Sequence, residues 1–420
     1  MRRVIETLVG FAVLTGVVVG ITTLTPVELP RVTTVEAIRS TKVVCVPAAA
    51  GATVMVDNTT TVTPLGGATT QTNRAVLTGQ ETSVVAEGTD GPTGSTIVGN
   101  DGVRTLTQCV KPVSRGVIAL PATADTQLKI VNPDASEAAI DLTLYGAEGE
   151  IQSLGARGIT LAAYEERAIA LSVLTKKATP VGVSFQASRG RAAVMAITQT
   201  QSSGTAAGPS QLGTSHLLPG IPAGATSSVI VLANPSETRI TANLTAYGTT
   251  PAYHPQGGEN ISIPSHASVS VSLENALLGE ASAIQVSSDA PVMAGMAFTL
   301  GDSAQVAPVS AGTSLGAFTP PGGTLQLTNP GEGDVQATVT ATGADGTEER
   351  ATVTVGTGQT TVHKLPTATE QGQRVVVSSD QPLFGAVVSS GDTGSWAAPL
   401  ESMTKGENPP LAAELDPGLH

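Results

Sequence analysis

One short phrase occurs three times in this chain: an apolar run that ends in Asn-Pro, followed by a strand-like run that ends at a glycine. The three pairs are Asn132-Pro133, Asn234-Pro235 and Asn329-Pro330. A glycine follows each asparagine after 14 residues, and these glycines are Gly146, Gly248 and Gly343. A fixed internal spacing that recurs after 102 and then 95 residues is typical of repeated domains. The chain is therefore predicted to be a tandem array of one β domain.

The repeated positions have a backbone explanation. Proline holds the residue before it in the extended region, so each asparagine is expected to end a strand and each proline to open a turn. The three glycines are expected to supply a positive φ where the next strand turns back. A second shared corner, Ser-Asp-x-Pro at 288–291 and 379–382, is expected to be a hairpin between the last two strands of a repeat.

Each repeat offers about seven short strand-like runs, and the alternation of apolar and polar residues in AIDLTLY and SVSVSL indicates strands with one buried face. About seven strands in a repeat of this length are typical of an immunoglobulin-like or fibronectin-like β-sandwich. A propeller is disfavoured because one blade needs only about 40–50 residues. The fold class is predicted to be all-β, with tandem sandwiches after one N-terminal transmembrane helix.

The predicted segments follow from the repeats and from the shifts in composition between them. Array domains are expected to share only small interfaces with their neighbours. The segments are an anchor or signal at 1–25, a stalk at 26–41, a Thr-rich β module at 42–114, sandwich repeats at 115–212, 213–312 and 313–400, and a disordered tail at 401–420.

The N-terminus resembles a membrane anchor. Arg2 and Arg3 precede the charge-free, largely apolar run Leu8–Leu24, and Val4–Leu24 is long enough to span a bilayer core of about 30 Å. The arginines keep the N-terminus in the cytoplasm, so the rest of the chain is predicted to lie outside the cell membrane. A cleaved signal peptide is the alternative, and Val35-Glu36-Ala37 lies far downstream for such a site. The predicted location is a single-pass membrane protein, or a secreted protein if the segment is cleaved.

The charge balance excludes one class of partner. The chain has 21 Lys+Arg against 34 Asp+Glu, a formal net charge of −13. A chain this acidic is not expected to bind nucleic acid. Aromatic residues make up only 2% of the sequence, so the cores are expected to consist of Val, Ile, Leu and Ala.

Cys45 and Cys109 are the only cysteines. In an exported protein an isolated pair is predicted to form a disulfide, here between the first and last strands of the Thr-rich module. Closing a loop of this length stabilises a fold by ~4 kcal/mol in the chain-entropy model. The alternative is that Cys45 accepts a lipid, but the apolar segment ends well before it.

No motif points to a reaction centre, so no catalytic residue, cofactor or metal ligand is predicted. Gly312-Thr313-Ser314-Leu315-Gly316 fits the G-x-S-x-G pattern, but Pro320 and Pro321 follow where a hydrolase needs a helix. His254 and His266 could meet across a loop, although surface positions are the simpler interpretation. Acidic residues after each Asn-Pro leave calcium binding between the repeats as an open alternative; they are Asp134, Glu137, Glu237, Glu332 and Asp334.

A carbohydrate-binding surface would need aromatic platforms. The candidates are Tyr145, Tyr164, Tyr247, Tyr253 and Trp396. Tyr145 and Tyr247 hold the same place, directly before the repeated glycine, which is more typical of packing than of ligand binding. The lone tryptophan is expected to cap the core of the last domain.

The whole layout resembles an actinobacterial family of exported envelope proteins, domain-of-unknown-function family 5719. The resemblance is carried by the Arg-led anchor, the Cys-bounded Thr-rich module and the tandem x-L-x-N-P…Y-G repeats, and Thr342 departs from it where tyrosine is expected. It implies an exported bacterial protein and supplies no catalytic residues.

These observations together predict a non-enzymatic structural or interaction protein of the bacterial cell envelope. Its partners are expected to be the membrane, through the N-terminal helix, and an envelope protein or wall polymer. The alternative is a carbohydrate-binding protein that recognises cell-wall glycan.

Overall fold

The structure, a computed structural model, describes residues 41–403 apart from 90, 100–104, 122–124, 177–179, 200–203, 321, 344, 367–371 and 390–394. The predicted anchor at 1–25, nearly all of the predicted stalk and residues 404–420 of the predicted tail lie outside the described residues. No helix in the described ranges has the length and hydropathy needed to cross a bilayer.

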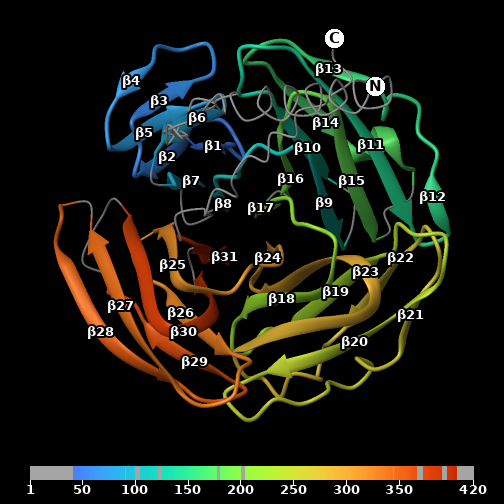
Figure 1. Cartoon of the computed structure of the whole chain (residues 1–420), viewed down its shortest axis with the longest axis vertical. Helices are drawn as coiled ribbons and strands as arrows, with labels where there is room; N and C mark the ends of the chain where they lie inside the picture. The colour runs from blue at the N-terminus through green and yellow to red at the C-terminus, as the bar shows by residue number, and fades with distance from the viewer. Residues whose placement is uncertain are drawn as a thin grey trace, which may run out of the picture. The chain divides into compact units, whose positions relative to one another are not determined.

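Four modules, each made of two antiparallel sheets, follow one another along the chain (Figure 1). Module 1 contains β1 (Thr41–Cys45), β2 (Ala52–Asp57), β3 (Thr61–Pro64), β4 (Thr70–Gln71), β5 (Arg74–Gln80), β6 (Val84–Gly88), β7 (Thr93–Val98) and β8 (Thr105–Gln108). Module 2 contains β9 (Arg115–Leu120), β10 (Thr126–Val131), β11 (Ala138–Gly146), β12 (Gly149–Ile151), β13 (Ile159–Leu161), β14 (Glu166–Ala170), α2 (Leu171–Leu174), β15 (Val181–Arg189), β16 (Ala193–Gln199) and β17 (Gly204–Ala207).

Modules 3 and 4 correspond to the second and third sequence repeats. Module 3 contains β18 (Gly213–Ile221), β19 (Ser227–Ala233), β20 (Ile240–Tyr247), β21 (Ile261–Ile263), β22 (Ser268–Ser272), β23 (Ser282–Leu300) and β24 (Asp302–Val306). Module 4 contains β25 (Gly312–Thr319), β26 (Thr324–Asn329), β27 (Val335–Gly343), β28 (Glu348–Val355), β29 (Gln359–Lys364), β30 (Gln373–Ser389), β31 (Trp396–Pro399) and β32 (Glu401–Ser402).

All four modules share one strand order. Their first sheets run β1-β6-β3-β4, β9-β15-β11-β12, β18-β23-β20-β21 and β25-β30-β27-β28. Their second sheets run β5-β2-β7-β8, β14-β10-β16-β17, β22-β19-β23-β24 and β29-β26-β30-β31. The Thr-rich module is therefore a fourth copy of the repeat, which the sequence conceals because this module has no Asn-Pro.

The alternation of residues along the strands builds the cores. In β11, Ile140, Leu142 and Leu144 are buried, while Asp141 and Thr143 between them stay partly exposed on the opposite face. Successive side chains of a strand point to opposite faces of its sheet, so the apolar positions meet the apolar face of the second sheet.

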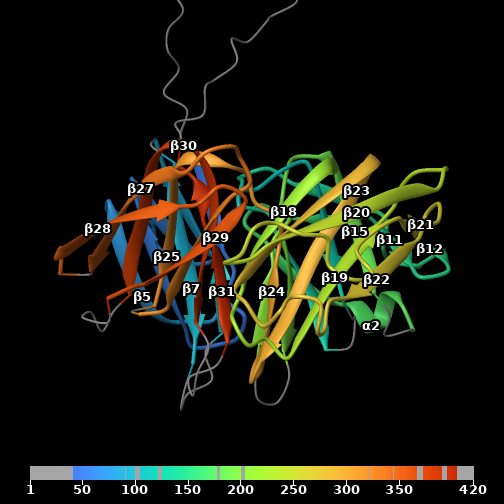
Figure 2. The ribbon, with the colours of Figure 1, turned by 90° about the horizontal axis from the view of Figure 1, so that it is seen from below.

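The predicted Ser-Asp-x-Pro hairpins are wrong. In module 3 the corner lies inside β23, which pairs with β18 and β20 before it and with β19 and β24 after it (Figure 2). In module 4 the corner lies inside β30 in the same way. Proline is tolerated there because the strand leaves one sheet and enters the other at this point, where ladder hydrogen bonds are not required.

The four modules close into a propeller-like ring rather than a string of beads. The last strand of each second sheet lies near the centre in Figure 1, and we call β8, β17, β24 and β31 the axial strands. Each axial strand contacts the next, and β31 contacts β8, so module 4 returns to module 1. The expectation of small, independent interfaces is wrong, because the chain from Ser40 onward forms one compact unit. A propeller was disfavoured because each repeat is longer than the about 40–50 residues of one blade. Each unit around this ring contains two sheets, and that accounts for its greater length.

The predicted role of the repeated glycines is wrong as well. Gly146, Gly248 and Gly343 are absent from the residues with positive φ. Each stands at or directly after a strand end, and at Gly248 an added Cβ would meet the Glu280 carboxylate. None of the three positions requires left-handed backbone, and Gly146 and Gly248 have little space for a side chain.

Two smaller expectations also need correction. The predicted tail at 401–420 begins in β32, because Glu401 pairs with Gly316 and extends the first sheet of module 4. The alternating pattern of RAIALSV at 167–173 predicts a strand throughout, but its second half forms the single helical turn α2, whose Leu171 and Leu174 are buried in the module 2 core.

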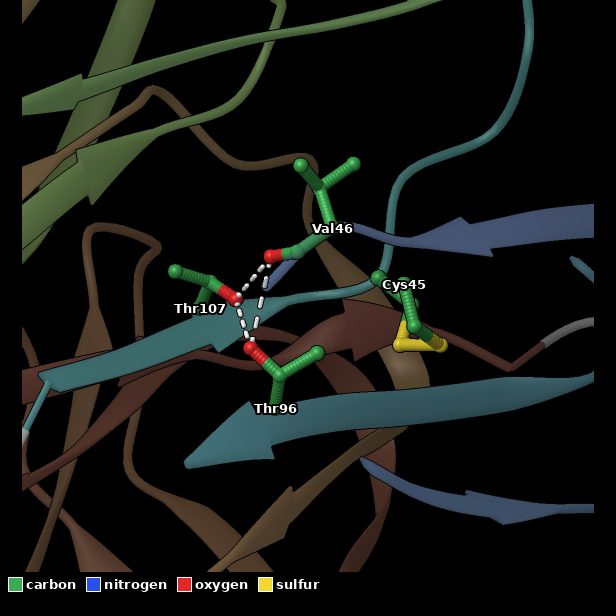
Figure 3. The surroundings of a disulfide bond; sticks show 5 residues. Cys45, Val46, Thr96 and Thr107 are labelled. Atoms are coloured by element: carbon green, nitrogen blue, oxygen red, sulfur yellow. Dashed lines mark hydrogen bonds between the residues drawn. A yellow bond between two sulfur atoms is a disulfide. The ribbon is translucent and has the colours of Figure 1, made fainter. Parts of the chain in front are cut away.

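Cys45 and Cys109 form a disulfide that joins the end of β1 to the segment after β8 (Figure 3). Next to it, the hydroxyl oxygens of Thr96 and Thr107 lie 3.3 and 3.0 Å from the Val46 carbonyl oxygen and within hydrogen-bonding distance of each other. Each hydroxyl has one proton, so one of them donates to the carbonyl and the other donates to its neighbouring hydroxyl. Covalent and polar links thus tie the two sheets of module 1 together beside its small Val-rich core.

Candidate functional site

The asparagine of each Asn-Pro is a buried clamp. Asn234 is fully buried, and its Nδ2 donates to the carbonyl oxygens of Thr238, Ile263 and Pro264 at 2.7, 3.2 and 3.0 Å. Its Oδ1 accepts from the Ser236 backbone N–H at 2.8 Å. Asn132 and Asn329 repeat this pattern with the residues two and four positions onward. The asparagine side chain therefore holds the loop that follows each Asn-Pro, in addition to any effect of the proline on the backbone.

A second equivalent position pairs with the residue just before the asparagine of each Asn-Pro, or before Asn58 in module 1, and it joins each module to the one before it around the ring. It is occupied by Arg74, Glu166, Ser268 and Thr360. Ser268 Oγ donates to the Pro180 carbonyl at 2.6 Å, and Thr360 Oγ1 donates to the Tyr247 carbonyl at 2.7 Å. We call these four places the joint positions.

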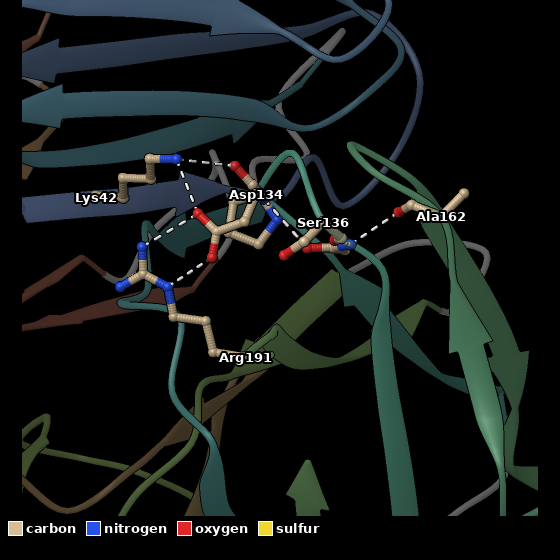
Figure 4. Close-up of polar contacts among 7 residues, drawn as sticks. Lys42, Asp134, Ser136, Ala162 and Arg191 are labelled. Carbon is tan, nitrogen blue, oxygen red and sulfur yellow. Dashed lines mark hydrogen bonds and ion pairs between the residues drawn. The ribbon is translucent and has the colours of Figure 1, made fainter. Parts of the chain in front are cut away.

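The joint between modules 1 and 2 is ionic (Figure 4). Asp134 Oδ1 accepts from Lys42 Nζ at 2.8 Å, and Asp134 Oδ2 accepts from Arg191 Nε at 2.7 Å. These two partners lower the pKa of Asp134 from 3.8 to about 2, with the Arg191 hydrogen bond as the largest cause and burial opposing it. The joint position Glu166 accepts from the Ser83 backbone N–H at 3.0 Å and pairs with Lys129 at 3.0 Å.

The structure also places the other candidate residues. Ser314 of the G-x-S-x-G pattern lies within the strand β25, so it is not on a strand-to-helix turn. His254 Nδ1 hydrogen-bonds to the Leu244 carbonyl at 2.9 Å, whereas His266 pairs with Glu237 at 3.0 Å in another loop. Among the described residues, no three His, Cys, Asp or Glu side chains gather as a metal site.

The aromatic candidates are mostly buried. Tyr145 and Tyr247 are each 7% exposed and Trp396 is 3% exposed, within the core of module 4. The Tyr145 ring stacks on His266 of module 3, with centroids 6.3 Å apart. Tyr164 is the aromatic residue of the group with a largely open surface, at 47% exposure. The two repeated tyrosines therefore belong to the joints between modules.

A polar cleft of about 620 Å³ lies on the outer face of the first sheet of module 2. Its floor consists of neighbouring residues of three strands, with Asp141 beside Gln186 and Gln186 beside Arg115. Thr143 and Ser184 form the next row. The walls are added by Arg157, Gln211, Leu212 and Pro235. Charged and amide groups lie among apolar and hydroxyl side chains on this surface, so it offers hydrogen bonds as well as apolar contact to a partner.

The two arginines of the cleft are available for binding. Arg157 is 64% exposed in its side chain and has a loose contact with Glu150 at 3.9 Å. No hydrogen bond or ion pair joins the Arg115 guanidinium to another described residue. Guanidinium groups favour carboxylates and phosphates, which they bind with paired hydrogen bonds. This face therefore carries one guanidinium without a described partner and a second one held only by the 3.9 Å contact with Glu150, in a chain with net charge −13.

Module 3 offers an internal reference for Asp141. Asp141 Oδ1 accepts from the Gly158 N–H at 2.7 Å, and at the equivalent place Asn243 Oδ1 accepts from the Asn260 N–H at 2.8 Å. A neutral amide therefore supports this loop as well as a carboxylate does. The negative charge of Asp141 is therefore not required for this hydrogen bond, and within the cleft it offsets part of the positive charge of the two arginines.

This cleft was not predicted from the sequence. Its residues lie at alternate positions of AIDLTLY and VGVSFQA, and this outward face is visible in the sequence as the polar half of each alternation. What the sequence did not contain was the register that lines up Asp141, Gln186 and Arg115.

Comparisons with known proteins identify the family but no activity. No curated protein matches the chain. A solved structure described as a tetra-tandem repeat in the extending region of a large adhesion protein aligns over 87% of this chain and 100% of its own. Its identity is 13% and its TM-score is 0.10, a likeness too small to indicate a shared fold. The model of the family of unknown function DUF5719 matches residues 68–366, most of the chain, and the chain therefore belongs to that family.

Proposed function

We propose that this protein is a non-enzymatic interaction protein of the bacterial cell envelope, which presents its β modules outside the membrane to a protein or wall partner. The segment Val4–Leu24, with its charge-free run Leu8–Leu24, would hold it as a single-pass anchor, and an actinobacterial source follows from the resemblance of the sequence. The Cys45–Cys109 disulfide supports an oxidising compartment. The modules are proposed to be variants of the immunoglobulin-like or fibronectin-like sandwich.

The polar cleft of module 2 is the observation that carries this proposal. Arg115 and Arg157 present guanidinium groups, while Gln186 and Gln211 present amides along the same surface. Such a set recognises a partner rich in carboxylates, phosphates or carbonyl oxygens. An acidic protein segment and an anionic wall polymer both have this chemistry.

Recognition of a neutral wall glycan is the alternative. Binding of sugar rings usually relies on open aromatic faces, but Tyr145 is covered by His266. A glycan site would therefore depend on the hydrogen-bonding groups of the cleft alone, or on Tyr164 elsewhere in module 2.

The test uses the full-length protein in intact cells with a photo-crosslinking residue at Gln186. The proposal predicts crosslinks to one envelope protein or to wall polymer, reduced about tenfold or more by the double change Arg115→Ala and Arg157→Ala. The matched control is Arg239→Ala with Arg350→Ala, which removes two exposed arginines from modules 3 and 4. Equal crosslinking by all three proteins contradicts the proposed cleft. Retention by neutral glycan that is lost in Tyr164→Ala identifies the alternative.

A further inference from the structure

The axial strands surround a second cavity, separate from the cleft, of about 280 Å³. All four modules contribute to its wall, each through its axial strand and the linker that follows, with Leu106, Ala206, Gln305 and Ala397 among the strand residues. Its volume is close to the lower end of the range of about 300–1,000 Å³ that is typical of small-ligand sites. Much of the wall is apolar, including Val110, Met195, Val309 and Leu400.

Two amide groups in this wall have polar atoms without partners. Gln305 is 8% exposed, and its Oε1 is buried with no hydrogen bond, although its Nε2 donates to Thr198 Oγ1 at 3.4 Å. Gln108 Nε2 is likewise buried without an acceptor. Both residues belong to the cavity wall, so rotation of their side chains would turn these unpaired atoms toward a ligand that offers one donor and one acceptor.

Glu401 places a carboxyl group in the same wall. The linkers of the first three modules pair with the first strand of their own module through Val110, Ser210 and Val309, and Glu401 pairs in the same way with Gly316 in module 4. Val110, Ser210 and Val309 make this pairing with neutral side chains. The pairing therefore does not require the carboxyl group of Glu401. The side chain lies deep among its neighbours while part of its surface stays accessible, and this burial raises the pKa of the Glu401 carboxyl, against the opposing influence of Lys111.

Lys111 completes the set. It is exposed, lines the cavity and is the basic group whose charge reaches Glu401. The wall thus combines one acid, one base, one unpaired acceptor and one unpaired donor. A peptide-like molecule has the complementary groups: an ammonium, a carboxylate, an N–H and a carbonyl oxygen.

We propose that the axial cavity binds a small zwitterion of the amino acid or dipeptide class, with its ammonium group at Glu401 and its carboxylate toward Lys111. An amide of the ligand satisfies Gln305 Oε1 and Gln108 Nε2. The apolar wall receives small aliphatic side chains, because the volume leaves no room for a longer peptide.

Calorimetric titration of the full-length protein tests this assignment with L-alanine, L-alanyl-L-alanine and the N-acetylated and C-amidated forms of the dipeptide. We expect 1:1 binding of the dipeptide or of the amino acid, weakened about tenfold or more by N-acetylation and by Glu401→Gln. C-amidation is expected to weaken binding to the natural protein but not to Lys111→Met. Glu259→Gln, which removes an exposed carboxylate outside the cavity wall, serves as the matched control.

Two results would overturn the assignment. One is the lack of binding by any of the four compounds at millimolar concentration, which would mean that the cavity holds only water. The other is equal affinity of the natural protein and Glu401→Gln, with thermal unfolding showing that both are folded. The Arg115 and Arg157 variants of the cleft are expected to leave this titration unchanged, so failure at one site is distinguishable from failure at the other.

Discussion

The guanidinium of Arg74, in module 1, lies over the ring of Phe318, in module 4, with its central carbon 5.3 Å from the ring centroid. Arg74 Nη1 also donates to the Gly343 carbonyl oxygen at 3.2 Å, and Arg374 pairs with Asp57 at 3.3 Å. Arg74 occupies the joint position of module 1, as Thr360 does in module 4. The contact that closes the ring is therefore the same structural joint that links consecutive modules, built here from a cation and an aromatic ring.

Asn234→Asp is predicted to destabilise the fold by about 3 kcal/mol. The replacement keeps the acceptor for Ser236 but turns a carboxylate oxygen toward three carbonyl oxygens in a fully buried place. Urea unfolding at neutral pH measures the loss. The matched control is Asn243→Asp, which is expected to change stability by less than about 0.5 kcal/mol because module 2 has Asp141 at that place. Similar losses in both variants would refute the clamp.

Gly295→Ala is predicted to destabilise the fold by about 2–3 kcal/mol, and Gly248→Ala by less than about 1 kcal/mol. An added Cβ at Gly295 would meet the Ala119 carbonyl oxygen across the joint between modules 2 and 3, where backbone must move. At Gly248 it would meet the exposed Glu280 carboxylate, which is able to turn away. The free energy of unfolding of each variant decides the order, and a larger loss for Gly248→Ala would contradict this reading.

Because of Asp134, the contribution of the joint between modules 1 and 2 to the free energy of unfolding is predicted to fall at acidic pH. Its pKa falls from 3.8 to about 2 on folding, so its contribution is fully present above pH 3.8 and is lost as the pH falls toward 2. After solvent screening the contribution is about 1 kcal/mol. Denaturant unfolding between pH 2 and 5 should show a smaller pH slope for Asp134→Asn than for the natural protein. Identical slopes would show that the ion pairs do not survive in solution.

The disulfide is predicted to stabilise module 1 by ~4 kcal/mol in the chain-entropy model. Intact mass of the oxidised protein should show no free thiol, and reduction should lower the melting temperature. Because module 1 contacts both module 2 and module 4, we expect the change to affect the whole ring rather than one domain. Two free thiols in folded, exported protein would contradict the pairing.

Much of the fold could be predicted from the sequence, because the alternation of apolar and polar residues within a short segment is enough to indicate a strand. AIDLTLY and SVSVSL form strands, and Trp396 lies in a core, as their patterns predicted. The closure of the ring was not visible, because it depends on the contact of Arg74 with Phe318, which no local pattern records. The long strands β23 and β30 were also misread, since proline normally ends a strand and the transfer between sheets removes that restriction.

The two proposed binding sites were even harder to predict from the sequence. Glu401 was assigned to a disordered tail, although its pairing with Gly316 places it in the wall of the axial cavity. No local sequence pattern distinguishes Arg115 and Asp141 from other polar residues on exposed strand faces. The register of three strands places them on one surface. Both sites arise from the assembly of distant segments, and the spacing of residues along the chain carries no record of it.

Chemical crosslinking across the closing joint tests the ring most directly. Asp57→Cys and Arg374→Cys are introduced together into the full-length protein, whose natural cysteines are held in their disulfide. A short bismaleimide is predicted to join the two positions within one chain, as shown by peptide mass spectrometry, and the product is expected to disappear when the protein is unfolded in urea. An open array of modules would instead give single adducts or links between chains, and that result would contradict the closed ring.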